Sequence, residues 1–235
     1  MKKIFFMFAM SVMFVSNIAM SAGAFGPREN KLIFNQEDGS ITYRIDNTDK
    51  NMPWLVQAWV EEAQENRTNK FTTAPLVFRV EPSSQFSVRV IKKGSVSDDK
   101  ESLFWVVSNT IPGGAETEFE KEDDKINAKI NLAYRYKVPM FYRPTSLKNI
   151  KQEPESLKWT VNNNGQVKVY NPTRFYVQLN YVSIDGERKQ GDGVTYMLSP
   201  MSSANVKISA KKGKTIKYGI VNDFGAVNEY PGIVN

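Results

Sequence analysis

The chain of 235 residues contains no cysteine and no histidine. Without cysteine there is no disulfide framework, no thiolate nucleophile and no thiolate zinc site. Without histidine, the commonest general base and the imidazole metal ligand are missing as well. The fold must therefore be held together by buried side chains, and most catalytic and metal chemistry is excluded. We expect no cofactor and no bound metal.

Cations are in excess, since 31 Lys and Arg stand against 25 Asp and Glu, giving a net charge of +6. A basic protein can bind nucleic acid, but here the cations are scattered among strand-like segments and no recognised motif accompanies them. Lys211, Lys212 and Lys214 gather around Gly213, as in a solvated hairpin turn. We expect no nucleic-acid partner.

The N-terminus has the pattern of a secretory signal peptide. A basic start (MKK) precedes an apolar run at 4–15 and small residues at 19–24. The run is shorter than the roughly 20 residues that span a bilayer, although an uncleaved membrane anchor is the alternative. We assign residues 1–24 to a cleaved signal peptide and expect a mature protein that is not inserted in a membrane.

Beyond residue 24, short alternating segments follow one another at the spacing of an all-β sandwich. They fall at 31–34, 41–45, 54–60, 76–80, 86–91 and 103–108, and then at 157–161, 166–170, 176–184, 194–198, 204–208 and 215–221. A polar stretch bounded by Pro144 and Pro154 separates the two series. We predict one β-sandwich domain at 25–144, a linker at 145–156 and a smaller one at 157–235.

The longest alternating stretch, at 126–144, ends the first series. Its even positions from 126 to 140 are all apolar, namely Ile126, Ala128, Ile130, Leu132, Tyr134, Tyr136, Val138 and Met140. Period two predicts a strand with one apolar face, and most strands have only about five or six residues. Such a strand either packs as an ordinary core strand or offers its surplus apolar surface to another protein. Its downstream part, with Val138 and Met140, is expected in the domain's own core.

An acidic run at 116–124 precedes that strand. A calcium loop needs Gly, Asn and carbonyl ligands at fixed offsets, and these offsets are absent. We interpret the run as a solvated loop.

Seven motifs occur in an order and spacing that resemble the periplasmic pilus (fimbrial) chaperones of the chaperone–usher pathway. They are 54–61 (WLVQAWVE), 80–82 (VEP) with 88–90 (VRV), 101–104 (ESLF), 141–144 (FYRP), 170–173 (YNPT) with 175–177 (FYV), 197–200 (MLSP) and 221–225 (VNDFG). The resemblance covers essentially the whole mature chain. It implies two immunoglobulin-like β-sandwich domains set at an angle like a boomerang, and a periplasmic location.

The resemblance also implies donor-strand complementation, an established form of β-augmentation in which the chaperone lends a strand to an incomplete pilus subunit. It places the donor strand at 126–140, with Ile126, Ala128, Ile130, Leu132 and Tyr134 as subunit-binding residues. The subunit would then pass to an outer-membrane usher. The exposed apolar edge also favours self-association of the free chaperone.

Two cations at the base of the interdomain cleft hold the subunit's terminal carboxylate in this family. Lys31 takes the place of the first, an arginine, and keeps the charge without the bidentate fork. The second place falls on Pro139, which is a departure. Lys137, two residues earlier on the same strand face, is the expected substitute, with Arg28 in reserve; solvated lysines are the alternative.

Glu101, Arg143 and Asp223 match a set that joins the two domains in the family. An arginine between carboxylates from different domains would fix the interdomain angle, so we interpret the set as structural, not catalytic. The segment that holds the acidic run is long, as in one branch of the family, but lacks that branch's flanking cysteine pair, which leaves the fibre type open.

Two other classes of function remain open. One is a secreted two-domain β-sandwich that serves as a structural or adhesive fibre subunit, although a subunit usually has a single short domain. The other is an enzyme with paired carboxylates, but nothing marks a particular pair. We expect no enzymatic activity.

Overall fold

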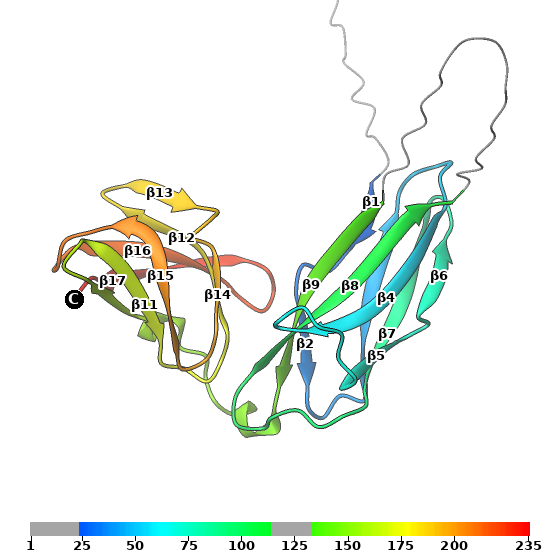
Figure 1. The fold of residues 1–235 in the computed structure, drawn as a ribbon, viewed down its shortest axis with the longest axis horizontal. Coiled ribbons are helices and arrows are strands. Elements are labelled where there is room, and N and C mark those ends of the chain that lie inside the picture. The colour runs from blue at the N-terminus through cyan, green and yellow to red at the C-terminus, as the bar shows by residue number, and fades with distance from the viewer. Residues whose placement is uncertain (1–23, 114–132) are drawn as a thin grey trace, which may run out of the picture.

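The computed structural model describes residues 24–113 and 133–235. Their regular structure is β-strand apart from two short 3-10 turns, Thr145–Leu147 and Pro154–Ser156. Figure 1 shows two β-sandwiches set at an angle, with these turns at the bend between them. The predicted all-β, two-sandwich architecture is confirmed. The predicted signal peptide, except its last residue, and residues 126–132 of the predicted donor strand lie outside the described residues.

The first sandwich consists of two sheets, with strand orders β1-β3-β7-β5 and β2-β9-β8-β4-β6. The strands are β1 Phe25–Pro27, β2 Leu32–Asn35, β3 Ser40–Asn47, β4 Trp54–Glu62, β5 Phe71–Ala74, β6 Val77–Val80, β7 Ser84–Lys92, β8 Ser102–Pro112 and β9 Tyr134–Arg143. Alternating apolar residues from both sheets, such as Phe34, Tyr43, Val106 and Met140, fill the core between them and are fully buried. This is the packing that the period-two pattern predicts.

The second sandwich has the strand orders β10-β11-β15 and β13-β12-β16-β17, with β14 pairing with β12. Its strands are β10 Lys158–Val161, β11 Gln166–Asn171, β12 Val177–Ile184, β13 Glu187–Gln190, β14 Tyr196–Leu198, β15 Ser202–Ser209, β16 Thr215–Val221 and β17 Val227–Ile233. Trp159, Val169, Leu179 and Tyr218 belong to its own core. Each sandwich therefore buries enough apolar surface to be a separate packing unit. In the described part of the chain, no helix is long and apolar enough to cross a membrane.

Strand β9 positions the residues of interest. It pairs antiparallel with β8 from Tyr134 to Tyr142. Its even side chains Val138 and Met140 are buried in the core, as the sequence predicted. Successive side chains of a strand point to opposite faces. The odd-numbered residues, from Arg135 to Arg143, therefore lie on the outer face of this sheet.

Candidate functional site

The upstream half of β9 has an open edge. β8 covers one side of the strand, but β2 pairs with the other side only at 140–143. Residues 134–139 thus have no strand on that side within the described residues. Unpaired N–H and C=O groups on a strand edge are a template for another chain. Pro139, the last residue of this stretch before the pairing with β2, has no N–H to donate to another strand.

Tyr134 begins this open stretch and is 42% exposed. Its ring packs against Trp54, with centroids 5.6 Å apart, and against Tyr136 at 6.1 Å. Tyr136 is fixed in turn, because its hydroxyl donates to the carbonyl of Phe25 at 2.6 Å. Of the five predicted subunit-binding residues, Tyr134 lies among the described ones. Ile126, Ala128, Ile130 and Leu132 lie outside them, and the role of all five stays a prediction.

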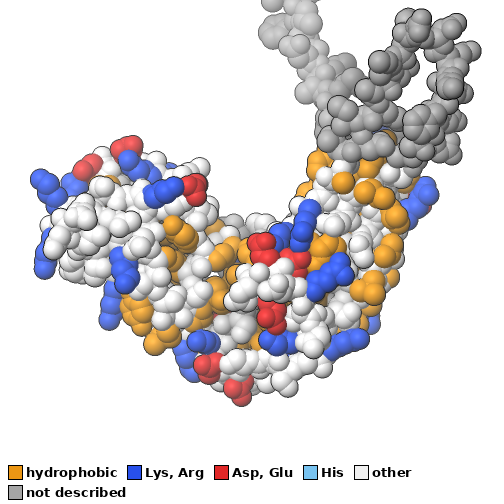
Figure 2. All heavy atoms as spheres, in the orientation of Figure 1, with side chains coloured by type: hydrophobic (Ala, Val, Ile, Leu, Met, Phe, Trp, Pro, Cys, Tyr) orange, Lys and Arg blue, Asp and Glu red, His pale blue; other side chains and the backbone are white. Residues whose placement is uncertain are grey.

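The outer face of β9 carries cations that share one buried acid. Glu61 of β4 is 3% exposed and binds Arg135 at 2.5 Å and Lys137 at 3.3 Å. The indole N–H of Trp59 donates to the same carboxylate at 2.8 Å. Burial alone would raise the pKa of Glu61, but the hydrogen bonds from Trp59 and Lys137 and the charge of Arg135 outweigh it and leave that pKa below its ordinary value. Figure 2 shows acidic and basic side chains together on the wall of the first domain that faces the second.

This cluster was not predicted from the sequence. The available signal was the pair of cations at odd positions 135 and 137, together with Trp59 and Glu61 two residues apart on another strand. Register brings them together, because β8 places Val107 opposite both Trp59 and Lys137. The cluster ties β4 to the upstream half of β9, where the edge is open.

Lys137 was predicted to replace the cation missing at Pro139. Its ammonium pairs with Glu61 and, at 2.8 Å, with Glu65. Among the residues that the structure describes, it shares no partner with Lys31, so the two predicted anchors are not brought into one contact. A subunit carboxylate would compete with Glu65, and the anchoring role of Lys137 stays a prediction.

Lys31 stands just before β2 and reaches across to the second domain. Its ammonium donates to the carbonyls of Val221 at 3.0 Å and Asn222 at 3.1 Å, and lies 5.4 Å from the ring centroid of Phe141. Burial lowers its pKa, against the opposing charge of Asp223. Within the described residues this ammonium forms no ion pair within 4.0 Å. An ammonium has three N–H donors, so one remains for a ligand.

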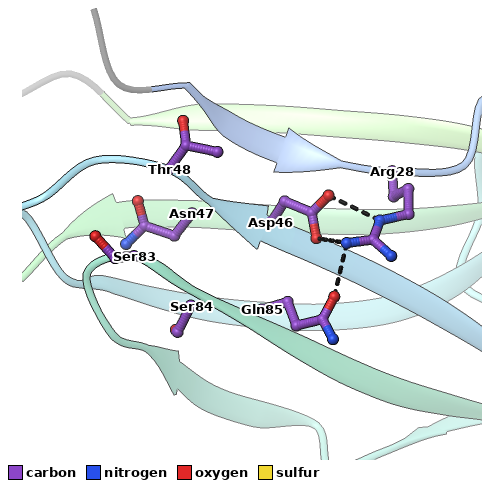
Figure 3. A pocket seen from close by; sticks show the side chains of 7 residues that line it. All are labelled: Arg28, Asp46, Asn47, Thr48, Ser83, Ser84 and Gln85. Atoms are coloured by element: carbon purple, nitrogen blue, oxygen red, sulfur yellow. Dashed lines mark hydrogen bonds and ion pairs between the residues drawn. The ribbon is translucent and has the colours of Figure 1, made fainter.

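Arg28, the reserve candidate, is engaged elsewhere. Figure 3 shows it at the rim of an open hollow lined by residues of β3 and of the segment that leads into β7. Its guanidinium donates twice to Asp46, both times at 2.8 Å, and once to Gln85 at 2.6 Å. No hydrogen bond joins the side chains of Arg28 and Lys31, whose polar partners are all different.

The structure brings Glu101, Arg143 and Asp223 together. Arg143 ends β9 and donates from Nε to Glu101 at 2.7 Å and from Nη1 to Asp223 at 2.9 Å. Glu101 precedes β8, whereas Asp223 lies in the turn between β16 and β17, so one guanidinium spans both domains. The backbone N–H of Tyr176 also donates to Glu101, and Gln152 donates to Asp223.

The two carboxylates differ in burial, and their pKa values shift in opposite directions. The side chain of Glu101 is 3% exposed, and burial raises its pKa despite the charge of Arg143. The side chain of Asp223 is 28% exposed; burial pushes its pKa upward too, but the hydrogen bond and charge of Arg143 prevail and leave it below the ordinary value. Both acids are held by the same cation, an arrangement that suits an interdomain joint.

The arrangement as a whole supports binding. It combines an open strand edge, a cation at the domain junction with a donor to spare, and a charged joint that holds two sandwiches at an angle. Among the described residues, no group of three acidic side chains is placed to hold a metal ion. An open strand edge of this kind is the feature that another chain uses when it binds by strand addition.

Comparison with known families identifies the class of the protein. The family model described as "Pili and flagellar-assembly chaperone, PapD N-terminal domain" matches residues 24–148 of the chain. The model described as "Pili assembly chaperone PapD, C-terminal domain" matches residues 152–232. The chain belongs to the PapD family of pilus assembly chaperones, whose members are chaperones and not enzymes.

Individual relatives span nearly the same length. The chain is 30% identical to the chaperone protein PapD of Escherichia coli over 204 residues, which cover 83% of this chain and 80% of the relative. It is 26% identical to the chaperone protein LpfB of Salmonella typhimurium over 212 residues, 88% of each chain. A chain from the structure of the Salmonella enterica SafA pilin in complex with the SafB chaperone has the same fold, with a TM-score of 0.74 at 23% identity, covering 92% of this chain and 98% of that one.

Proposed function

We propose that this protein is a periplasmic chaperone that binds pilus subunits by adding its β9 strand to them and then delivers them to an outer-membrane usher. The observation that carries the proposal is the open edge of β9 at 134–139. The SafA–SafB complex, in which a pilin is bound by a chaperone, supports it by analogy of fold.

The open edge suits a partner that lacks a strand. A subunit strand laid along 134–138 would gain main-chain hydrogen bonds, and β8 already holds β9 in an extended form. Such preorganisation lowers the entropic cost of binding. Upstream, Ile126, Ala128, Ile130 and Leu132 would enter the subunit's groove together with Tyr134. Burial of the three central large side chains, Ile130, Leu132 and Tyr134, at about 25 cal/mol per Å² would contribute several kcal/mol.

Lys31 supplies a site for the subunit's terminal carboxylate. A hydrogen bond between an ammonium and a carboxylate is among the stronger ones, and partial burial of Lys31 reduces competition from water. Lys137 would bind the same carboxylate after its ion pair with Glu65, whose side chain is 67% exposed, is broken. The ion pair between Glu61 and Arg135 would remain. The Glu101–Arg143–Asp223 set would hold the second domain at the angle that leaves room for the subunit.

Co-expression in the periplasm with neighbouring secreted proteins, followed by pull-down and mass spectrometry, tests the proposal. Wild-type protein should recover a pilus subunit, whereas Ile130→Asp and Leu132→Asp should recover none and remain folded. Normal recovery by both variants would reject the strand-donor role. The location of the protein in the cell distinguishes a chaperone from a fibre subunit. A fibre subunit would appear in surface fibres and not in the periplasmic extract.

A further inference from the structure

Phe224 is the most exposed large hydrophobic residue of the described part of the chain, at 96%. It lies in the turn between β16 and β17, and Figure 1 shows this turn reaching from the second domain toward the first. An aromatic ring left in water gains nothing for the fold, because its burial would be favourable. A single exposed apolar residue is common on protein surfaces, so the surroundings of this ring decide whether it serves a contact.

The backbone that carries Phe224 is fixed. The side-chain oxygen of Asn222 accepts hydrogen bonds from the N–H groups of Phe224 at 2.9 Å and Ala226 at 3.0 Å. Gly225 has a φ of +83°, a conformation that glycine adopts readily, and its N–H donates to the carbonyl of Asn222. Asp223 is bound to Arg143 of the first domain. The ring therefore stands on a rigid turn, and a partner that covers it pays little for ordering the backbone.

The same turn also holds the cation of the site. The ammonium of Lys31 binds the carbonyls of Val221 and Asn222, so it lies against the backbone two residues before Phe224. The turn thus carries an exposed aromatic ring and is bound, through its backbone, by a cation that has a donor to spare. The matching ligand has a carboxylate and an apolar side chain on the same residue. A polypeptide that ends in an apolar residue meets this requirement.

We propose that Phe224 packs against the side chain of the subunit's C-terminal residue while Lys31 binds that residue's carboxylate, so that this turn selects subunits ending in a large apolar or aromatic residue. The inference rests on the proposed function, because it needs a subunit in the cleft. It adds a specificity-determining residue from the second domain to a binding strand from the first.

The test is a double-mutant cycle on the complex between this chaperone and the subunit that it recovers. The chaperone variants are Phe224→Ala and Phe224→Leu, with Ile233→Ala as the matched control, because Ile233 is a 57% exposed apolar residue of the same domain. The subunit is used with its natural last residue and with alanine there. Affinity is measured by competition with labelled wild-type chaperone.

With the natural subunit, Phe224→Ala should bind about tenfold more weakly, Phe224→Leu should lose less, and Ile233→Ala should match wild type. With the alanine-ended subunit, Phe224→Ala should cause no further loss. Three outcomes overturn the inference: an unchanged affinity for Phe224→Ala, an equal loss with both subunits, or a defect only in usher binding or self-association. If wild-type chaperone recovers no subunit at all, the proposed function fails as well, so the two failures are distinct.

Discussion

β9 and β17 are the last strands of the two sandwiches, yet their edges differ. β16 covers one side of β17 over its full length, and the only bridge on the other side in the described residues joins the next residue, Val234, to Trp159. β17 carries Glu229 and Pro231. A charge and a proline both discourage the addition of another strand at an edge. The open stretch of β9 at 134–139 contains no acid; its two cations, Arg135 and Lys137, are paired with Glu61, and its proline, Pro139, stands at the end next to β2.

The comparison separates fold from function. Both sandwiches have the same architecture and the same kind of final strand, but the free edge of β17 carries an acid and an internal proline, whereas the open edge of β9 carries cations and ends at its proline. Binding therefore resides in local edge chemistry and not in the immunoglobulin-like fold as such. The charged joint then connects the two places, because Arg143 ends β9 and Asp223 precedes β17.

The largest effect is expected from a charge placed on each edge in turn. Tyr134 and Val227 are the first residues of β9 and β17 and are 42% and 44% exposed, which makes them a matched pair. Tyr134→Asp should lower subunit affinity more than about tenfold, because the carboxylate would be buried against the subunit. Val227→Asp should leave affinity unchanged. Equal losses from both, in variants with wild-type melting temperatures, would contradict the assignment of binding to β9.

The interdomain joint of Glu101, Arg143 and Asp223 should contribute to the stability of the fold. Arg143→Ala leaves Glu101 buried without its cation, and we expect a loss of about 3 kcal/mol in the free energy of unfolding. Urea titration measures it. Arg79→Ala is the control, because Arg79 pairs with Glu81 at a site where both side chains are about 60% exposed, and such pairs contribute below about 1 kcal/mol. Similar losses in the two variants would remove the joint's special role.

A smaller effect is expected where an acid ties each of the strands β9 and β17 to another strand of its sheet. Glu61→Gln removes the charge that binds Arg135 and Lys137 beside β9, and should cost about 1–3 kcal/mol because the site is buried. Glu229→Gln in β17 breaks a pair with Lys217, with side chains 43% and 63% exposed, and should cost less than Glu61→Gln does, because an exposed ion pair contributes little. Thermal unfolding of both variants measures the two stability losses. A larger loss for Glu229→Gln than for Glu61→Gln would contradict the account.

The smallest effect is expected in the dependence of stability on pH. The pKa of Asp223 is below its ordinary value of 3.8, so its contribution to stability is complete above that pH and is lost as the pH falls through the lower folded value. Glu101 acts in the opposite sense, because its raised pKa makes stability fall as the pH rises above 4.5 through the folded value. Asp223→Asn should therefore lose less stability on acidification between about pH 4 and pH 2 than wild type does. Parallel curves in urea titrations over this range would refute the assignment.

Most of the strands could be predicted because their buried faces repeat every second residue; β16 has the same bounds, 215–221, as the sequence predicted. Four strands were missed. β1 and β5 are too short for a period to show, and β13 (ERKQ) is exposed at every position, so no apolar face marks it. β17 contains Pro231 and Gly232, which indicate a turn by local propensity, but pairing with β16 overrides it.

The site was predictable only in part. The trio of Glu101, Arg143 and Asp223 came from motif resemblance, since no spacing rule brings residues so far apart together. The partner of Lys137 could not be foreseen, because Glu61 reaches it through the register of β4, β8 and β9. The open edge likewise depends on where β2 stops pairing, which is a property of the sheet and not of the β9 sequence.

Amide hydrogen exchange tests the central claim most directly. In the free protein, the edge-facing amides of residues 134–138 should exchange quickly, and in the subunit complex they should become protected, while the amides of β17 stay unchanged. Protection that appears only elsewhere, with these β9 amides exchanging as fast as before, would contradict binding by strand addition.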